Sequence, residues 1–180
     1  MRTDRLELRP LTPEDAEACN AYQSLPEITP YIYWEPRSLD ETKAWIDRVA
    51  SSTGADALVM IRSDTGELVG DVGIWSVGDH NGAEIGYTVH PKHQGQGFAT
   101  EAVRVALRLG FEERGYHRIV ARLDARNDAS RKVLERLGLR REAHFVSNEF
   151  VKGEWTDELV YAMLADEWAQ LSVDSPSVPS

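Results

Sequence analysis

Alternating hydrophobic and polar positions identify several short segments of this chain as strands. In the clearest run, residues 83–90, Ala, Ile, Tyr and Val alternate with Glu, Gly, Thr and His, which gives one apolar and one polar face. Turns at 64–66 and 78–82 then join neighbouring strands. The strands predicted by such patterns are 5–9, 58–61, 68–75, 83–90, 119–124, 139–147 and 154–164.

Apolar residues at helical spacing predict four helical segments between these strands, at 13–22, 38–50, 98–109 and 129–137. Asn127 is a suitable N-cap for the last of them, and Gly138 is a favourable residue just beyond its end. The segment 24–37 contains three prolines and several aromatic residues, so we expect an irregular loop that faces a substrate.

The length of 180 residues and the hydrophobic content of 42% fit a single domain, which we place at residues 1–170. Residues 171–180 have little apolar mass and are expected to form a disordered tail. Cys19, the single cysteine, lies among alanines and is expected to be a buried packing residue. With neither a signal-peptide core nor an apolar run of about 20 residues, the sequence predicts a cytoplasmic protein without membrane contact.

The formal net charge of −10 argues against a nucleic-acid partner, since phosphate backbones select basic surfaces. The charge is unevenly distributed: residues 90–141 carry +6 and the remainder of the chain carries −16. This basic segment is what an anion-binding region would need, and the acidic remainder favours a cationic acceptor. Solvated helix faces are the alternative explanation for the basic charges.

A glycine-rich turn, Gln94-Gly95-Gln96-Gly97-Phe98-Ala99, follows the strand at 83–90 and opens the helix at 98–109. Its unpaired backbone N–H groups lie at the positive end of the helix dipole, an arrangement that binds phosphate groups. A P-loop would need Gly-Lys-Ser/Thr at its end, and a Rossmann turn would need a small third residue at Thr100 and a parallel βαβ unit. Both of these nucleotide-binding motifs fit poorly.

The motif Gln94-x-x-Gly97-x-Ala99 in this strand-turn-helix setting, together with Asn127-Asp128-Ala129-Ser130 and Leu137-Gly138-Leu139, resembles the core of the GNAT N-acetyltransferases. More dispersed residues, from Arg5-Leu6-Glu7-Leu8-Arg9 to Trp155 and Asp157, are similar to the ribosomal-protein N-acetyltransferase branch. The resemblance implies a single α/β domain of the α+β type. It implies a mixed, mostly antiparallel sheet of about seven strands flanked by about four helices, opening where the strands at 84–90 and 119–124 separate.

The resemblance also implies acetyl-CoA as cosubstrate, entering that opening, and an amine acceptor that is either a protein N-terminus or a small molecule. The turn amides would bind the pyrophosphate, the backbone at 88–90 would pair with the pantetheine arm, and residues at the next helix start would lie near the sulfur. The cofactor-binding residues predicted in this way are Thr88, Val89, His90, Gln94, Gly95, Gln96, Gly97, Phe98, Ala99, Thr100, Asn127 and Ser130.

For catalysis, Glu84 is the candidate general base, on the polar face of the strand that leads to the turn; ion pairing of a strand glutamate is the alternative. The resemblance implies the Val89 N–H as oxyanion donor and Ser130 as proton donor to the thiolate. Tyr31, Tyr33, Trp34 and Trp75 are candidate substrate-binding residues, with packing in the core as the alternative.

The histidines at 90 and 93 lack a third ligand nearby, so no metal site is predicted. A non-catalytic acyl-CoA-binding or sensing module is the alternative function. A homodimer is compatible with the sequence, which leaves the oligomeric state open.

Overall fold

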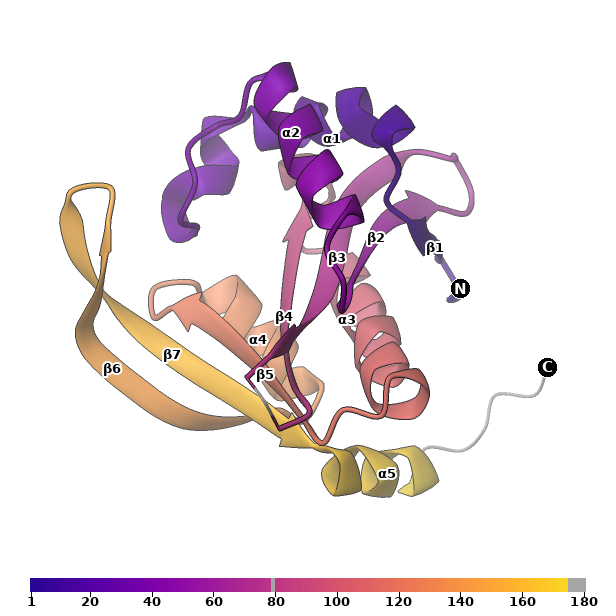
Figure 1. Ribbon diagram of the computed structural model, residues 1–180, viewed down its shortest axis with the longest axis vertical. Helices are drawn as coiled ribbons and strands as arrows, with labels where there is room; N and C mark the ends of the chain where they lie inside the picture. The colour runs from indigo at the N-terminus through magenta and orange to yellow at the C-terminus, as the bar shows by residue number, and fades with distance from the viewer. Residues whose placement is uncertain (79, 175–180) are drawn as a thin grey trace.

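The computed structural model describes residues 1–78 and 80–174, with side chains up to Leu171. Its helices and strands build one layered unit of a sheet and covering helices (Figure 1). Short 3-10 turns at Pro13–Asp15, Pro26–Tyr31 and Pro91–His93 and a π-helical turn at Leu109–Glu113 connect or extend these elements. The elements are β1 (Leu6–Pro10), α1 (Ala16–Gln23), α2 (Leu39–Ala50), β2 (Ala55–Arg62), β3 (Leu68–Val77), β4 (Gly82–Val89), α3 (Phe98–Arg108), β5 (Arg118–Asp124), α4 (Asp128–Arg136), β6 (Arg140–Val151), β7 (Glu154–Leu164) and α5 (Ala165–Asp174).

The seven strands form one sheet in the order β1-β2-β3-β4-β5-β7-β6, and β4–β5 is the parallel pair in an otherwise antiparallel sheet. The expected mixed, mostly antiparallel sheet is therefore confirmed. The parallel pairing covers three residue pairs and ends at Glu84↔Val120. Beyond that point the two strands diverge, and Figure 1 shows them adjacent at one end and apart at the other. The predicted opening in the sheet is present.

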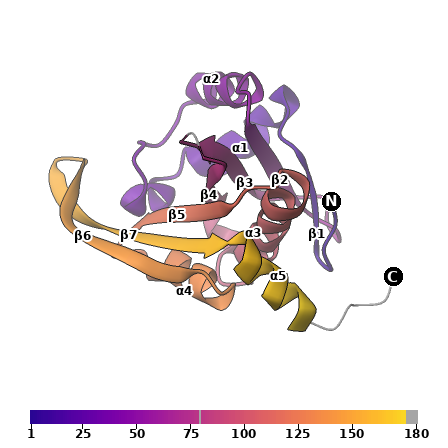
Figure 2. The same ribbon diagram turned by 60° about the horizontal axis from the view of Figure 1, so that its bottom comes forward.

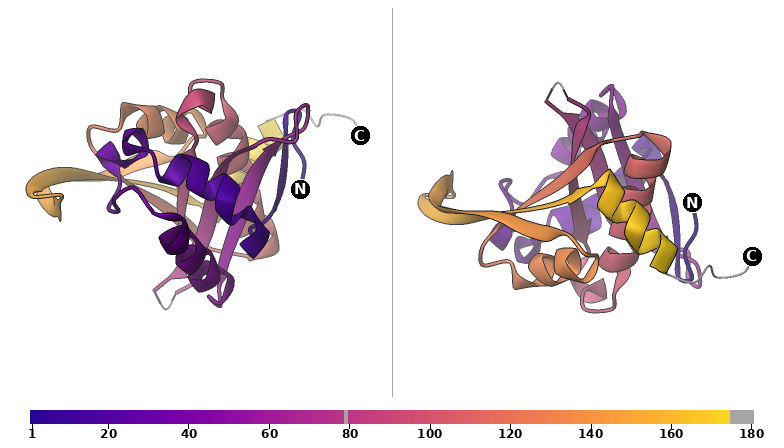
Figure 3. Two further views of the ribbon diagram at one scale, coloured as in Figure 1. Left: turned by 90° about the horizontal axis from the view of Figure 1, so that it is seen from above. Right: turned by 90° about the horizontal axis from the view of Figure 1, so that it is seen from below.

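Helices cover both faces of the sheet, and the alternation of side chains along the strands decides which residues pack on each face (Figures 1 and 3). On β2, Met60 packs with the residues of α3 and α4, while its neighbour Val59 packs with α1 and α2. Cys19 lies in the second of these clusters, fully buried as expected, and burial raises the pKa of its thiol to about 12. The cysteine is therefore a packing residue.

The C-terminal part of the chain differs from the prediction in one respect. Helix α5 continues to Asp174, so residues 171–174, which we expected in a disordered tail, are helical, and the α-helices number five among the described residues. The rest of the predicted tail, 175–180, lies outside the described residues. Trp168 anchors the helix: its ring stacks on Phe111 at a centroid distance of 5.9 Å, and its Nε1 donates to Glu112 at 2.9 Å. Such tertiary packing leaves little signal in the local sequence.

The long hairpin of β6 and β7 projects beyond the rest of the sheet (Figures 2 and 3). Lys152, next to its turn, reaches the N-terminal half of the chain, because its Nζ donates to the carbonyl oxygen of Thr29 at 2.6 Å. The hairpin thereby holds the loop before α2 near β5. Within residues 1–78 and 80–174, no helix is both long and apolar enough to cross a bilayer.

Candidate active site

The turn between β4 and α3 depends on two glycines with left-handed backbone conformations. Gly95 has φ 72° and Gly97 has φ 88°, values that residues with a Cβ rarely adopt. Helix α3 begins immediately afterwards, so its first amides have no acceptor within the helix. In the described part of the chain, none of the backbone N–H groups of residues 95–100 donates to a protein acceptor. The turn therefore presents a set of unpaired donors, as the sequence predicted.

Arg5 supports this turn from the side of β1. Its Nη1 donates to the carbonyl oxygen of Gln96 at 2.8 Å, and its Nε donates to Glu101 at 2.6 Å. Its guanidinium carbon also lies 4.9 Å from the centroid of the Phe98 ring. Because C=O and N–H point in opposite directions across a trans peptide, the N–H of Gly97 is directed away from Arg5. The arginine therefore fixes the orientation of an amide that an anion would use.

A cavity of about 600 Å³, which we call the turn cavity, lies between this turn and α4. Asn127 caps α4 as expected, its Oδ1 accepting from the Ser130 amide at 3.0 Å. Lys132 and Arg136 stand one turn apart on α4, exposed and without an ion pair among the described residues. The hydroxyl oxygen of Thr100 is buried and has no hydrogen-bond partner in the described structure. Unpaired amides, an orphaned hydroxyl and two cations together fit a phosphate-bearing ligand.

The basic excess of residues 90–141 is mostly not directed at this cavity. Seven of its twelve cations form ion pairs, and most of their carboxylate partners come from outside the segment, as in Arg114–Asp56 and Arg118–Glu142. Of all twelve, Lys132 and Arg136 line the turn cavity. The interpretation of the whole segment as an anion-binding region is therefore too broad, because the fold brings acids from elsewhere to neutralise it.

The backbone of β4 offers different groups from those expected. The His90 amide donates to the Val69 carbonyl at 2.8 Å, and the His90 carbonyl accepts from His93 at 2.8 Å, so both groups of His90 are engaged. Along an antiparallel ladder the direction alternates, so the backbone of Thr88 also faces β3, where it lies opposite Asp71. The N–H of Val89 faces the gap left by β5. The expected backbone contacts of Thr88 and His90 with a ligand do not fit this geometry, whereas that of Val89 does.

Gln96 also differs from expectation, because it does not line the turn cavity. Its carbonyl accepts from Arg5, and its side-chain Nε2 donates to the Lys92 carbonyl at 3.2 Å. Gln94, in contrast, lies against the cavity, and its Nε2 donates to the carbonyl of Val89 at 3.0 Å, which ties the turn to the strand end. The predicted residues that do line the turn cavity are Thr88, Val89, Gln94, Gly95, Gly97, Phe98, Ala99, Thr100, Asn127 and Ser130.

A second cavity, of about 620 Å³, lies over the β2–β3–β4 face of the sheet; we call it the aromatic cavity. The four aromatic residues predicted to bind substrate, Tyr31, Tyr33, Trp34 and Trp75, all line it. The indole of Trp75 lies over a cross-strand glycine pair: a Cβ on Gly86 would come within 3.0 Å of that ring. The glycines thus make room for an aromatic floor.

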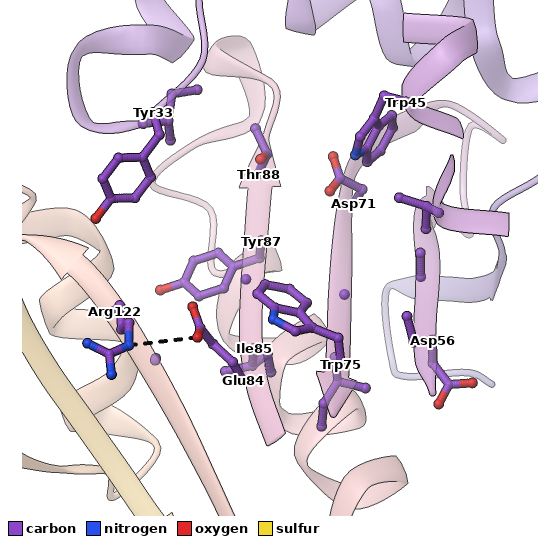
Figure 4. Close-up of a pocket in the computed structure, with 18 of the residues that line it drawn as sticks. Tyr33, Trp45, Asp56, Asp71, Trp75, Glu84, Ile85, Tyr87, Thr88 and Arg122 are labelled. Carbon is purple, nitrogen blue, oxygen red and sulfur yellow. Dashed lines mark ion pairs between the residues drawn. The ribbon is translucent and has the colours of Figure 1, made fainter. Parts of the chain in front are cut away.

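Charged residues of both signs line the aromatic cavity. Its carboxylates are Asp56, Asp71 and Glu84, and its guanidinium groups are Arg37 and Arg122. Figure 4 shows Asp71 beside Trp45 at one end of the cavity, and Glu84 with Arg122 at the other. Despite the −16 charge outside residues 90–141, the cavity is therefore not uniformly acidic.

Glu84 stands at the point where β4 and β5 separate, on the polar face of β4 as predicted. Its Oε2 is 3.7 Å from the Nε of Arg122, and its side chain is 24% exposed. Burial raises the pKa of Glu84, with a further contribution from the charge of Glu158, while Arg122 opposes the shift. The carboxylate both faces the cavity and pairs loosely with a cation, so the two roles considered for it are compatible.

The two cavities meet at a shared wall in the gap between β4 and β5. Tyr87 belongs to this wall, and its hydroxyl donates to the Ser130 carbonyl at 3.3 Å. Burial raises the pKa of Tyr87 to about 12, so its proton is retained at neutral pH. A ligand with its anionic end in the turn cavity would therefore place its other end beside Tyr87 and within reach of the aromatic cavity. The residues that line both cavities are Tyr31, Ile32, Tyr87, Thr88, Asn127 and Ser130.

Sequence reasoning missed three residues of this site. Tyr87 belongs to the apolar set of alternating positions, and no local signal shows that β5 separates from β4 beside it. Asp71 occupies a polar strand position, where a carboxylate is unremarkable, yet it lines the aromatic cavity and burial raises its pKa to about 6. Arg37 follows a proline in the irregular loop and also lines that cavity. Their spatial convergence is visible in the fold alone.

Comparison with known proteins shows which family this sequence and fold resemble. Residues 5–140 match the family described as "Acetyltransferase (GNAT) domain". An uncharacterized N-acetyltransferase of Bacillus subtilis, YnaD, is 31% identical over 166 residues, which cover 92% of this chain and 97% of YnaD. The ribosomal protein uS5 alanine N-acetyltransferase of Escherichia coli is 29% identical over 107 residues, covering 58% of this chain and 55% of that protein.

Solved structures agree with these relationships. The crystal structure of a GNAT-family acetyltransferase from Bacillus anthracis superimposes with a TM-score of 0.86 at 29% identity, covering 93% of this chain and 99% of that chain. A spermidine N-acetyltransferase from Vibrio cholerae, solved in complex with CoA and spermine, has the same fold, with a TM-score of 0.83, 24% identity and coverage of 93% and 99%.

Proposed function

The chain belongs to the GNAT family and is an N-acetyltransferase, and on this premise we propose that it moves an acetyl group from acetyl-CoA to a primary amine by direct attack in a ternary complex. The acceptor is a protein N-terminal or small-molecule amine that arrives as a cation. One observation carries the proposal: the phosphate-fitting turn cavity and the carboxylate-bearing aromatic cavity share a wall in the gap between β4 and β5. Two substrates bound in the two cavities would meet there.

Acetyl-CoA would be held mainly by the turn cavity, with its diphosphate on the amides of residues 95 and 97–99. Thr100 supports this placement, because its buried hydroxyl lacks a partner that a phosphate oxygen would supply. Lys132 and Arg136 provide the positive charge for a phosphate group. The acetyl thioester that this cosubstrate supplies would then lie at the shared wall.

Glu84 acts as the general base, directly or through a water molecule. An amine must lose a proton to become nucleophilic, and a carboxylate is a better proton acceptor when its pKa is raised toward neutrality. Burial raises the pKa of Glu84 in this direction, and its carboxylate faces the aromatic cavity. The loose ion pair with Arg122, 3.7 Å between its Nε and Oε2 of Glu84, orients the carboxylate without fully neutralising its charge.

The N–H of Val89 stabilises the negative charge that develops on the carbonyl oxygen during attack. Three features support this role: the N–H faces the gap by the alternation of the ladder, β5 has already separated from β4 there, and Gln94 holds the Val89 carbonyl at 3.0 Å. A donor that is fixed in place before the reaction loses little energy to reorganisation.

Ser130 donates a proton to the departing thiolate, and Tyr87 positions Ser130. The serine lines both cavities, and the tyrosine hydroxyl holds its carbonyl oxygen at 3.3 Å. The ammonium gives one proton to Glu84 before attack, and the attacking nitrogen gives a second to solvent as the C–S bond breaks. Ser130 regains from solvent the proton that it gave to the thiolate, so the products are the amide, the free thiol and one released proton. Asn127 caps α4 and lines both the turn cavity and the aromatic cavity.

A thiol-release screen tests this function. The protein is supplied with acetyl-CoA and a panel of peptides and small amines, and the formation of free CoA thiol is followed, with the Glu84→Gln variant as matched control. Amine-dependent release that falls strongly in the variant is expected. If acetyl-CoA raises the melting temperature while no amine accelerates thiol release, the non-catalytic acyl-CoA-binding module is the better description.

A further inference from the structure

Arg37 lies at the end of the aromatic cavity occupied by Asp71 and Trp45, and its guanidinium group is close to two indole rings. The guanidinium carbon is 4.2 Å from the ring centroid of Trp34 and 5.0 Å from that of Trp45. Its Nη1 donates to Oε1 of Gln23 at 3.0 Å. The hydrogen bond to Gln23 uses one of the five N–H donors of the guanidinium group, and the other donors remain for a ligand.

The backbone around Arg37 is also fixed. Its amide donates to the Gln23 carbonyl at 2.9 Å, and its carbonyl accepts from Nδ2 of Asn20 at 2.8 Å. A side chain that is held in this way loses little conformational freedom when a ligand binds. The guanidinium group is therefore preorganised toward the cavity.

Arg37 has no carboxylate partner, whereas the other partly buried arginines of the described structure are each paired with a carboxylate. Among the arginines whose side chains are described, Arg37 is the one that is partly buried and has no carboxylate within 4.0 Å. The nearby carboxylate of Asp71 instead accepts from the Tyr22 hydroxyl. Burial lowers the pKa of Arg37, although the charge of Asp71 opposes the shift. A partly buried cation without a paired anion is costly, and a bound anion would offset that cost.

We propose that Arg37 binds a carboxylate group of the acceptor, so that the preferred acceptors are small amines that also carry a carboxylate, such as amino acids. The planar guanidinium matches a carboxylate with two parallel hydrogen bonds. This inference rests on the proposed function and selects the small-molecule class of acceptor over a protein N-terminus. The ammonium group of such a zwitterion lies at the shared wall, and Glu84, at the other end of the cavity, receives its proton through water.

The short distance between Arg37 and the wall shared by the two cavities agrees with a small acceptor. Asp71, next to Arg37, is paired in register with Thr88, and Thr88 belongs to the wall where the two cavities meet. Neighbouring strands lie about 4.8 Å apart, so one small molecule spans from the wall to Arg37. Glu84 lies four residues before Thr88 along the same strand, about 13 Å away at the usual rise per residue. An acceptor can therefore reach the arginine without leaving the wall, and water molecules in the cavity carry its proton to Glu84.

The test compares matched acceptors that differ in the carboxylate alone: L-amino acids, their carboxamides and the corresponding decarboxylated amines, each with saturating acetyl-CoA in the thiol-release assay. We expect kcat/KM to be about ten- to a hundredfold higher for the acids, the usual worth of hydrogen bonds to a charged group, mostly through KM. In Arg37→Gln this preference should disappear. In Arg37→Lys it should become smaller, because lysine keeps the positive charge but cannot form two parallel hydrogen bonds with a carboxylate.

Arg48→Gln is the matched control, since Arg48 is exposed on α2, has no ion pair among the described residues and does not line the cavity. It should retain the preference for acids. Equal kcat/KM for acids and amines in the wild type would overturn the inference, and so would an equal loss for both in Arg37→Gln or Arg37→Lys, which would indicate a purely structural role. An absence of thiol release with every amine would instead overturn the proposed function, and this inference with it.

Discussion

Replacing Thr100 by valine should change stability and cofactor affinity in opposite directions. The hydroxyl of Thr100 is buried in the first turn of α3 without a partner in the described structure, and it faces the turn cavity. In the free protein an unpaired buried hydroxyl is destabilising. In the complex, a phosphate oxygen would accept its proton. Valine has nearly the same shape, so it removes the hydroxyl and leaves the packing intact.

The magnitudes follow from the two environments of the hydroxyl. An unsatisfied buried polar group costs about 1–3 kcal/mol, so Thr100→Val should raise the free energy of unfolding of the free protein by about 1 kcal/mol or more. For a protein of this size that corresponds to a rise in Tm of about 2–4 °C per kcal/mol. A hydrogen bond to a charged group contributes about 1.5–3 kcal/mol, so CoA affinity should fall about ten- to a hundredfold.

Thermal denaturation without ligand and calorimetric titration with CoA measure the two effects. Thr42→Val is the matched control, because the Thr42 hydroxyl is buried on α2 but accepts from Nδ2 of Asn20 at 3.0 Å. That variant should lose stability and keep its CoA affinity. If Thr100→Val left CoA affinity unchanged, or lowered stability as Thr42→Val does, the assignment of the orphaned hydroxyl to a phosphate would be refuted.

Three further predictions concern the reaction and the turn. Glu84→Gln should lower turnover about 10²-fold with CoA affinity unchanged, and it should remove the loss of rate seen as pH falls through the raised pKa of this base, measured by kcat against pH. Ser130→Ala should lower kcat about 10²-fold, whereas Tyr87→Phe should cost about tenfold or less; the reverse order would make Tyr87 the proton donor. Gly97→Asp should abolish CoA binding in a folded protein, while Gly66→Asp, which also has a positive φ but lies outside both cavities, should retain it in the same titration.

The features of the fold and the site that could be predicted from the sequence are those with a local physical cause. The alternation along residues 83–90 placed Glu84 on the cavity face of β4, and the glycines at 95 and 97 predicted a turn with unpaired amides. Asn127 was recognisable as a helix cap from its type and position alone. The GNAT fold and the acetyltransferase class were recognisable from the same motifs, and both are confirmed.

The parts that were missed depend on contacts between distant segments. The basic segment looked like an anion-binding region because its acidic partners, such as Asp56 for Arg114, lie elsewhere in the sequence. The engaged backbone of His90 could not be foreseen without the register of β3 against β4. Helix α5 was not predicted, and it is anchored to the body of the domain where Trp168 packs on Phe111. Arg37 is exceptional because of the partner it lacks, which is a property of the folded molecule.

A crystal structure of the protein with CoA would show directly whether the turn and the gap between β4 and β5 hold the cosubstrate. We expect the diphosphate on the amides of residues 95 and 97–99, the Thr100 hydroxyl within hydrogen-bond distance of a phosphate oxygen, and the sulfur beside Tyr87 and Ser130 in the gap between β4 and β5. A structure in which the phosphates lie away from this turn, or in which the sulfur is remote from the wall shared by the two cavities, would contradict this expectation.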